Sequence, residues 1–133
     1  VIAGSGLVGI VIDTGPNYAK VRSIIDDASN VSGMALSTSD PCIVSGNLVS
    51  MNENQVIEFS ELKCGKQPVK SGEQIVTSHI SDKYLEGILI GYISVIERNS
   101  NNLTYSGTLT PAVDFQHLQE VLVILDKKTI QEK

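Results

Sequence analysis

Aromatic side chains and clustered positive charge are both scarce in this 133-residue chain. It has no Trp, aromatic residues make up 5% of it, and no basic cluster is larger than Lys127-Lys128. Proteins that bind a nucleic-acid backbone need a basic patch, and those that stack bases or sugars need aromatic platforms. Because the formal net charge is also -5, we expect no nucleic-acid partner.

Long hydrophobic runs and a cysteine framework are missing as well. Nearly uncharged apolar runs such as residues 87–96 are about half the roughly 20 residues that a membrane-spanning helix needs. Cys42 and Cys64 are too few for a disulfide framework and lack the CxxC spacing of a structural zinc site. We predict that they form no essential disulfide. The chain does not start with Met, so we expect targeting or anchoring segments to precede Val1.

The chain does contain enough apolar sequence for a packed core. Hydrophobic residues make up 41% and charged residues 19%. These values are close to the averages of globular domains and far from those of disordered chains. Since domains usually have roughly 100–150 residues, we expect one ordinary domain or two very small ones.

Short β-branched and aliphatic runs, separated by Gly, Asn, Ser, Asp and Pro, predict an all-β fold of short antiparallel strands. Residues 7–12 and 18–25 flank a turn at residues 13–17, which predicts a first hairpin. Residues 88–96 and 103–109 predict a second hairpin across a polar turn. Weak similarity between the two units favours two small barrel-like subdomains.

Further elements are expected between and after these hairpins. The last run, residues 121–125, is apolar at every position, which predicts a strand buried on both faces. One helical turn is expected at residues 115–120, with little helix elsewhere. Shorter strands are predicted at residues 31–36, 42–44, 48–51, 56–59 and 74–77.

Ser78, His79 and Asp82 are the residue types of a serine hydrolase. Neighbouring residues of an extended strand point to opposite faces, however, so Ser78 and His79 are poorly placed to act as nucleophile and base. The only other histidine is His117, and no Gly-x-Ser-x-Gly elbow surrounds a serine. We therefore expect no catalytic residues and predict that the chain is not an enzyme.

Metal and cofactor sites are not indicated either. The two histidines and two cysteines are too widely spaced for a zinc site of known type. Residues 4–9 match the letters G-x-G-x-x-G, but a turn and a second strand follow, where a dinucleotide-binding fold has a crossover helix. We expect no metal ion and no cofactor.

Four segments, in order along the chain, resemble the β-region of MreC, the bacterial rod-shape-determining family. Residues 6–11 and 15–21 resemble its opening strands. Residues 70–78 resemble its Lys-x-Gly-Asp-x-Val-Val-Thr-Ser-Gly run, and residues 85–91 resemble its Pro-x-Gly-Ile-Pro-Val-Gly run. Residues 111–115 together with residues 118–125 resemble its closing segment, so the resemblance spans nearly the whole chain.

Three residues depart from the pattern of that family. His79 stands where the family usually has Gly, which disfavours a positive φ at that turn. Leu85 and Leu89 stand where it often has Pro, so this loop is expected to be less rigid.

The resemblance implies a fold and a location. Residues 1–133 are expected to form an extracytoplasmic β module with two small sub-barrels, of which about residues 28–97 form the inner one. A transmembrane helix and a dimerising coiled coil would lie upstream, outside this chain. They would anchor the module at the bacterial cytoplasmic membrane.

The resemblance also implies a function. MreC-like proteins are non-catalytic scaffolds of the cell-wall elongation machinery, and their partners are penicillin-binding transpeptidases, MreD and MreB, together with further copies of themselves. The alternative from the residues alone is a small-ligand-binding β-barrel. An upstream apolar span followed by heptads would favour the anchored scaffold, and its absence would favour the ligand-binding barrel.

The predicted partner-binding residues are Tyr84, Leu85, Ile88 and Leu89. Tyr84 and Leu85 follow a polar turn-like group and precede a strand, and loops on rigid β-scaffolds commonly carry binding. Interface hot spots also favour Tyr. The other interpretation is that Tyr84 and Leu85 close one end of a barrel, because apolar residues beside a strand are more often core.

Overall fold

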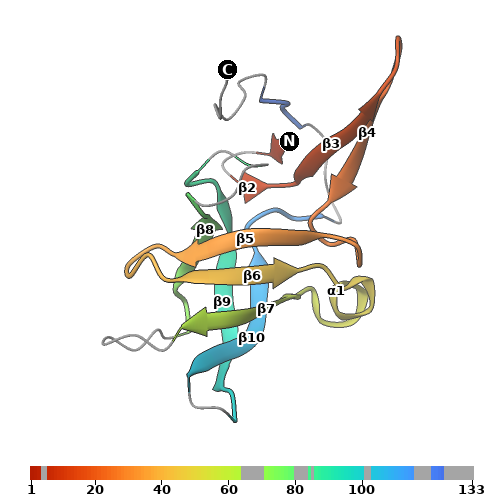
Figure 1. Cartoon of the computed structure of the whole chain (residues 1–133). Helices are drawn as coiled ribbons and strands as arrows, with labels where there is room; N and C mark the ends of the chain where they lie inside the picture. The colour runs from red at the N-terminus through yellow and green to blue at the C-terminus, as the bar shows by residue number, and fades with distance from the viewer. Residues whose placement is uncertain are drawn as a thin grey trace.

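The computed structural model describes residues 1–3, 6–63, 71–79, 84, 86–100, 103–115 and 121–124. Its elements are short strands and one short helix (Figure 1). No helix in these ranges is long and apolar enough to cross a membrane. In chain order the strands and the helix are β1 (Ile2–Ala3), β2 (Gly6–Leu7), β3 (Gly9–Thr14), β4 (Ala19–Ser23), β5 (Asn30–Ala35), β6 (Pro41–Ser45), α1 (Leu48–Asn54), β7 (Ile57–Lys63), β8 (Gln74–Thr77), β9 (Leu89–Arg98) and β10 (Thr104–Pro111).

Six of the strands close into a barrel. Their order is β5-β6-β7-β10-β9-β8, and β8 pairs back to β5 through Gly33 opposite Thr77. Every pairing within the barrel is antiparallel. The small β1–β2 pair joins the barrel by one parallel contact, Gly6 opposite Leu89. The predicted all-β fold is confirmed, with this parallel pair as an addition.

The barrel interior is filled by side chains that alternate along the strands. On β7, Ile57 and Phe59 are buried while Glu58 between them is exposed, which is the period-2 pattern of a half-buried strand. Complete burial of a side chain such as Phe59 stabilises the fold by roughly 1.5–3 kcal/mol. The other fully buried large apolar residues of the barrel strands are Val31, Val44, Leu62, Ile75, Ile90 and Leu109.

Both predicted hairpins are present. β3 and β4 pair from Gly9 opposite Ser23 to Thr14 opposite Ala19, and they form a separate two-stranded sheet that projects from one end of the barrel (Figure 1). The two strands approach closely at Gly9, where an added Cβ would lie 2.2 Å from the carbonyl oxygen of Arg22. The β9–β10 hairpin forms two walls of the barrel.

The strand predicted at residues 48–51 is wrong, because this segment is the first half of α1. The carboxylate of Asp27 accepts a 2.8 Å hydrogen bond from the backbone N–H of Leu48 and satisfies one of the free donors at the helix start. Met51 is buried in the barrel core. Gln55, with φ of 58°, follows the last helical residue. A contact with a residue far back in the sequence thus decides the local structure.

The last predicted strand is also wrong in its burial. Residues 121–124 carry one isolated bridge, in which Ile2 and Leu122 exchange hydrogen bonds of 2.8 and 2.7 Å. Leu122 is 65% exposed, and Val121 and Val123 are exposed as well. Within the described ranges this stretch lies at the molecular surface beside β1, so it has no second strand to cover it. Leu125 and residues 116–120, the body of the predicted helical turn, lie outside the described residues.

Candidate protein-interaction site

Tyr84 lies between the β3–β4 hairpin and the barrel. It is 7% exposed and belongs to the main hydrophobic cluster. Its ring borders two hollows, and Ile10 of β3 lines both of them. Burial raises the pKa of the Tyr84 hydroxyl, and the positive charge of Arg22 on β4 partly offsets that rise. Tyr84 therefore joins the projecting hairpin to the barrel.

Gly87 and Ile88 are held by hydrogen bonds to β8. The backbone N–H of Ile88 donates to the side-chain oxygen of Thr77 at 2.8 Å, and the N–H of Thr77 donates to the carbonyl of Ile88 at 2.8 Å. Thr77 is fully buried, and Gly87 takes the positive φ of 86° that this tight connection requires. The segment before β9 is thus fixed to the barrel.

The four predicted partner-binding residues do not all lie in one place. Tyr84 and Ile88 line the same hollow. Leu89 is half-buried at the start of β9, where it pairs with Val76 and Gly6, and it is not among the lining residues. Leu85 lies outside the described residues.

The larger hollow, here called the hairpin groove, has a volume of about 310 Å³. Four separate parts of the chain form it: Val1, residues of the β2–β4 region, Tyr84 with Ile88, and Val123 with Ile124. Most of its lining side chains are apolar, as expected of a site that binds an apolar surface. They belong to Val1, Leu7, Gly9, Ile10, Val11, Thr14, Ala19, Tyr84, Ile88, Val123 and Ile124.

Exposed apolar side chains continue from the groove along the hairpin. Ile12 is 44% exposed, Val21 is 40% exposed, and Tyr18 near the hairpin turn is 60% exposed. Where exposed apolar side chains gather into a patch, they often mark an interaction site. Sequence reasoning did not assign the β3 and C-terminal residues to the site, although their apolar character was visible in the two runs that contain them.

Ser78 and His79 differ in exposure, and both lie just beyond β8, which ends at Thr77. Ser78 is fully buried, and its N–H donates to the carbonyl of Ser32 at 2.9 Å. His79 is exposed. Asp82 and His117 lie outside the described residues, and within the described ones no group of three His, Cys, Asp or Glu residues could hold a metal ion.

A family model described as "Rod shape-determining protein MreC, barrel core" matches residues 1–125. The chain belongs to the MreC family. It is 27% identical over 122 residues to the cell shape-determining protein MreC of Listeria monocytogenes, a match that covers 90% of this chain and 40% of that protein. It is 39% identical over 59 residues to MreC of Bacillus subtilis, covering 44% of this chain and 20% of that protein.

Solved MreC structures have the same fold. The structure of MreC from Listeria monocytogenes matches with a TM-score of 0.70 at 27% identity, covering 84% of this chain and 53% of that chain. The structure of MreC from Pseudomonas aeruginosa matches with a TM-score of 0.64 at 17% identity, covering 82% of this chain and 68% of that one, and it supports the fold alone. The predicted family is therefore confirmed, and the chain spans less than half the length of the curated MreC relatives that it matches.

Proposed function

We propose that this MreC-family barrel core is a non-catalytic scaffold of the bacterial cell-wall elongation machinery and helps to maintain cell shape through protein–protein contacts. The observation that carries the proposal is the family match over residues 1–125. Its proposed place is the extracytoplasmic face of the cytoplasmic membrane, held there by an upstream transmembrane helix. Its proposed partners are a penicillin-binding transpeptidase, MreD, MreB and further copies of the chain.

The hairpin groove supports a binding role for this scaffold. Its lining is mainly apolar and comes from four parts of the chain, of which one includes the β3–β4 hairpin that projects from the barrel. Tyr84 and Ile88 contribute to its wall, and Leu85 and Leu89 flank them in sequence. We propose that these four residues shape the partner contact, with the exposed side chains of the hairpin making most of it.

The domain organisation remains a proposal too. In it, residues 1–133 form one extracytoplasmic module with two β subdomains. The closed barrel supports an inner unit, and its sixth strand, Thr104–Pro111, extends that unit beyond residue 97.

The alternative function, a small-ligand-binding barrel, has less support. The barrel interior is occupied by side chains, such as Phe59, Ile90 and Leu109, that are 0–2% exposed. A ligand would therefore have to bind outside the barrel, in a groove such as the one beside the hairpin. The volume of that groove, about 310 Å³, is at the lower end of the roughly 300–1,000 Å³ that small-molecule sites have.

Capture from membranes tests the scaffold proposal. The full-length protein would be expressed with Ile12→Lys and Val123→Lys together, and a matched variant would carry Leu103→Lys, which is exposed on the distant β9–β10 turn. Capture of penicillin-binding transpeptidases, detected with a fluorescent penicillin, and rod shape in a depleted strain should be lost only with the first variant. Equal capture by the unmodified protein and both variants would refute the groove as the contact surface.

A further inference from the structure

The outer wall of the barrel carries a second hollow, well separated in sequence from the hairpin groove. It has a volume of about 490 Å³ and lies across β6, β7, β10 and β9. We call it the barrel trough. Its lining residues are Ser45, Glu58, Phe59, Ser60, Val95, Glu97, Ser106, Gly107 and Thr108.

Strand register places the outward side chains of the trough in rows. Ser45 lies opposite Glu58, Glu58 lies opposite Thr108, and Thr108 lies opposite Val95. In the next row, Ser106 lies opposite Glu97. Because β10 separates β7 from β9 and the two rows are two residues apart along β10, strand spacings of about 4.8 Å and a rise of about 3.4 Å per residue place the Cα atoms of Glu58 and Glu97 roughly 12 Å apart.

The trough is concave because β10 bends. The ladder shifts register between Tyr105 and Gly107 on one side of β10 and between Thr108 and Leu109 on the other, and bulges of this kind bend a strand (Figure 1). At Gly107 the neighbouring strand comes so close that an added Cβ would lie 1.9 Å from the carbonyl oxygen of Val95. The floor residues are consequently half-buried.

Two of the four hydroxyl groups that line the trough present only acceptors. The Ser106 hydroxyl donates its proton to Asn99 Oδ1 at 2.7 Å, and the Asn99 amide donates to Thr104 Oγ1, which fixes the orientation of that amide. The Ser45 hydroxyl donates to Asn30 Oδ1 at 2.9 Å. Both hydroxyl oxygens therefore keep only lone pairs for a ligand.

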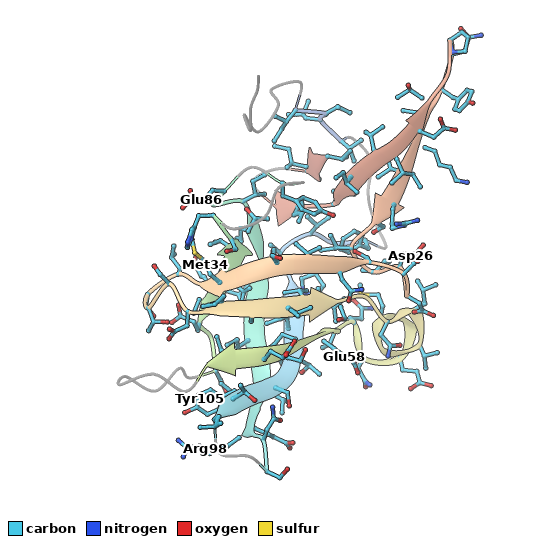
Figure 2. All side chains as sticks on the ribbon, in the orientation of Figure 1. Asp26, Met34, Glu58, Glu86, Arg98 and Tyr105 are labelled. Atoms are coloured by element: carbon cyan, nitrogen blue, oxygen red, sulfur yellow. The ribbon has the colours of Figure 1, made fainter. Side chains whose placement is uncertain are left out.

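The rim of the trough carries negative charge. Glu58 and Glu97 are exposed, and Figure 2 labels Glu58 on β7. None of the described lining residues is Lys or Arg. The nearby Arg98 is held over the ring of Tyr105, with 5.6 Å from its guanidinium carbon to the ring centroid. A ligand for this surface should be positively charged and rich in hydrogen-bond donors.

From this chemistry we propose that the barrel trough binds an extended polypeptide segment of a partner protein that carries two basic side chains. One ammonium or guanidinium group pairs with Glu58 and the other with Glu97. Backbone N–H groups of the segment donate to the acceptor oxygens of the floor. Bases and sugars would need an aromatic platform. Phe59 is the one aromatic residue in the described lining of the trough, and its side chain is buried in the barrel core. The proposal does not depend on the function assigned to the hairpin groove.

Peptide titration of the 133-residue chain tests this assignment. The probe is a short acetylated peptide with two Lys residues at alternate positions among Ser and Thr, and the control peptide has Gln in place of both Lys. The Lys peptide should shift the backbone amide signals of Val95, Ser106 and Thr108 in NMR spectra. Equal binding of the Gln peptide, or shifts only elsewhere in the chain, would overturn the proposal.

Protein variants then separate the trough from the overall negative charge. Glu58→Gln with Glu97→Gln should weaken binding at least about tenfold, since each lost contact is a hydrogen bond to a charged group. Glu53→Gln with Glu86→Gln changes the net charge equally at exposed positions outside the trough and should change the Kd less than about twofold. An equal loss in both double variants would refute the site.

Two further measurements test whether the peptide binds in the trough and whether any polycation would bind there equally well. Thr108→Lys places a fixed cation in the trough and should abolish peptide binding while the thermal unfolding temperature stays near that of the parent chain, so it decides the matter if the double variant fails to fold. Spermine should bind more weakly than the Lys peptide. Spermine binding of equal strength at the same amides would show a simple counterion site and overturn the peptide proposal.

Discussion

Replacing Tyr84 with Ala should destabilise the chain by about 3 kcal/mol. Truncating a buried aromatic residue to Ala costs roughly 3–5 kcal/mol, because apolar contacts are lost and a cavity remains. Two hollows, of about 310 and 130 Å³, already border the ring, so water can enter the vacated space and the cost should fall at the lower end of that range. The melting temperature should drop by about 10 °C, given a change of a few degrees per kcal/mol for a chain of this size.

Urea unfolding followed by circular dichroism measures this loss. The matched control is Tyr18→Ala, because Tyr18 is 60% exposed near the hairpin turn whereas Tyr84 is 7% exposed. The control should change the free energy of unfolding by no more than about 0.5 kcal/mol. A loss below about 1 kcal/mol for Tyr84→Ala would refute its structural role and would favour a direct interface role for this residue.

Two further predictions concern Cys42 and Asp27. Burial raises the pKa of the Cys42 thiol from 9.0 to about 12, so the unfolded chain loses this proton first as the pH rises, and stability should fall by up to about 4 kcal/mol between pH 9 and 12. Denaturation at several pH values should show this fall of the free energy of unfolding in the parent chain and a smaller fall in Cys42→Ala. Cys42 should react with a thiol reagent only after the chain unfolds, because it is buried in the native state. Asp27→Ala should lower the free energy of unfolding by about 1 kcal/mol, because the hydrogen bond to Leu48 is lost. Asp27→Asn keeps an acceptor oxygen and should lower it less. Equal losses for the two variants in thermal melts would argue against a capping role for Asp27.

Local sequence predicted most strands correctly, but it did not predict the elements that depend on contacts with distant parts of the chain. The two hairpins follow from turn residues and β-branched runs. The burial of Ser78 beside exposed His79 does not follow from strand alternation, because β8 ends at Thr77 and residues 75–78 are all buried. Residues 48–51 were mistaken for a strand because the groups that stabilise α1, the carboxylate of Asp27 and the barrel core around Met51, come from elsewhere in the chain. No local pattern carries that information.

The candidate sites show the same division. Tyr84 and Ile88 were singled out from their position before β9, and both do line the hairpin groove. Val11 and Val123 were not, because their place in the groove depends on how the hairpin and the C-terminal stretch lie against the barrel. The barrel trough depends on the register of four strands, in which β10 places Glu58 and Glu97 on the same surface.

Closure of the barrel has a consequence for the order in which the chain can fold. The β3–β4 and β9–β10 hairpins join neighbouring segments and can form early, since hairpins form in about 1–10 μs. The β7–β10 and β5–β8 seams instead join Ile57 to Leu109 and Gly33 to Thr77, so long loops must be ordered before either seam is stabilised. Refolding should therefore be limited by these two seams, and until they close, the strand edges that the finished barrel hides stay open to pairing with other chains.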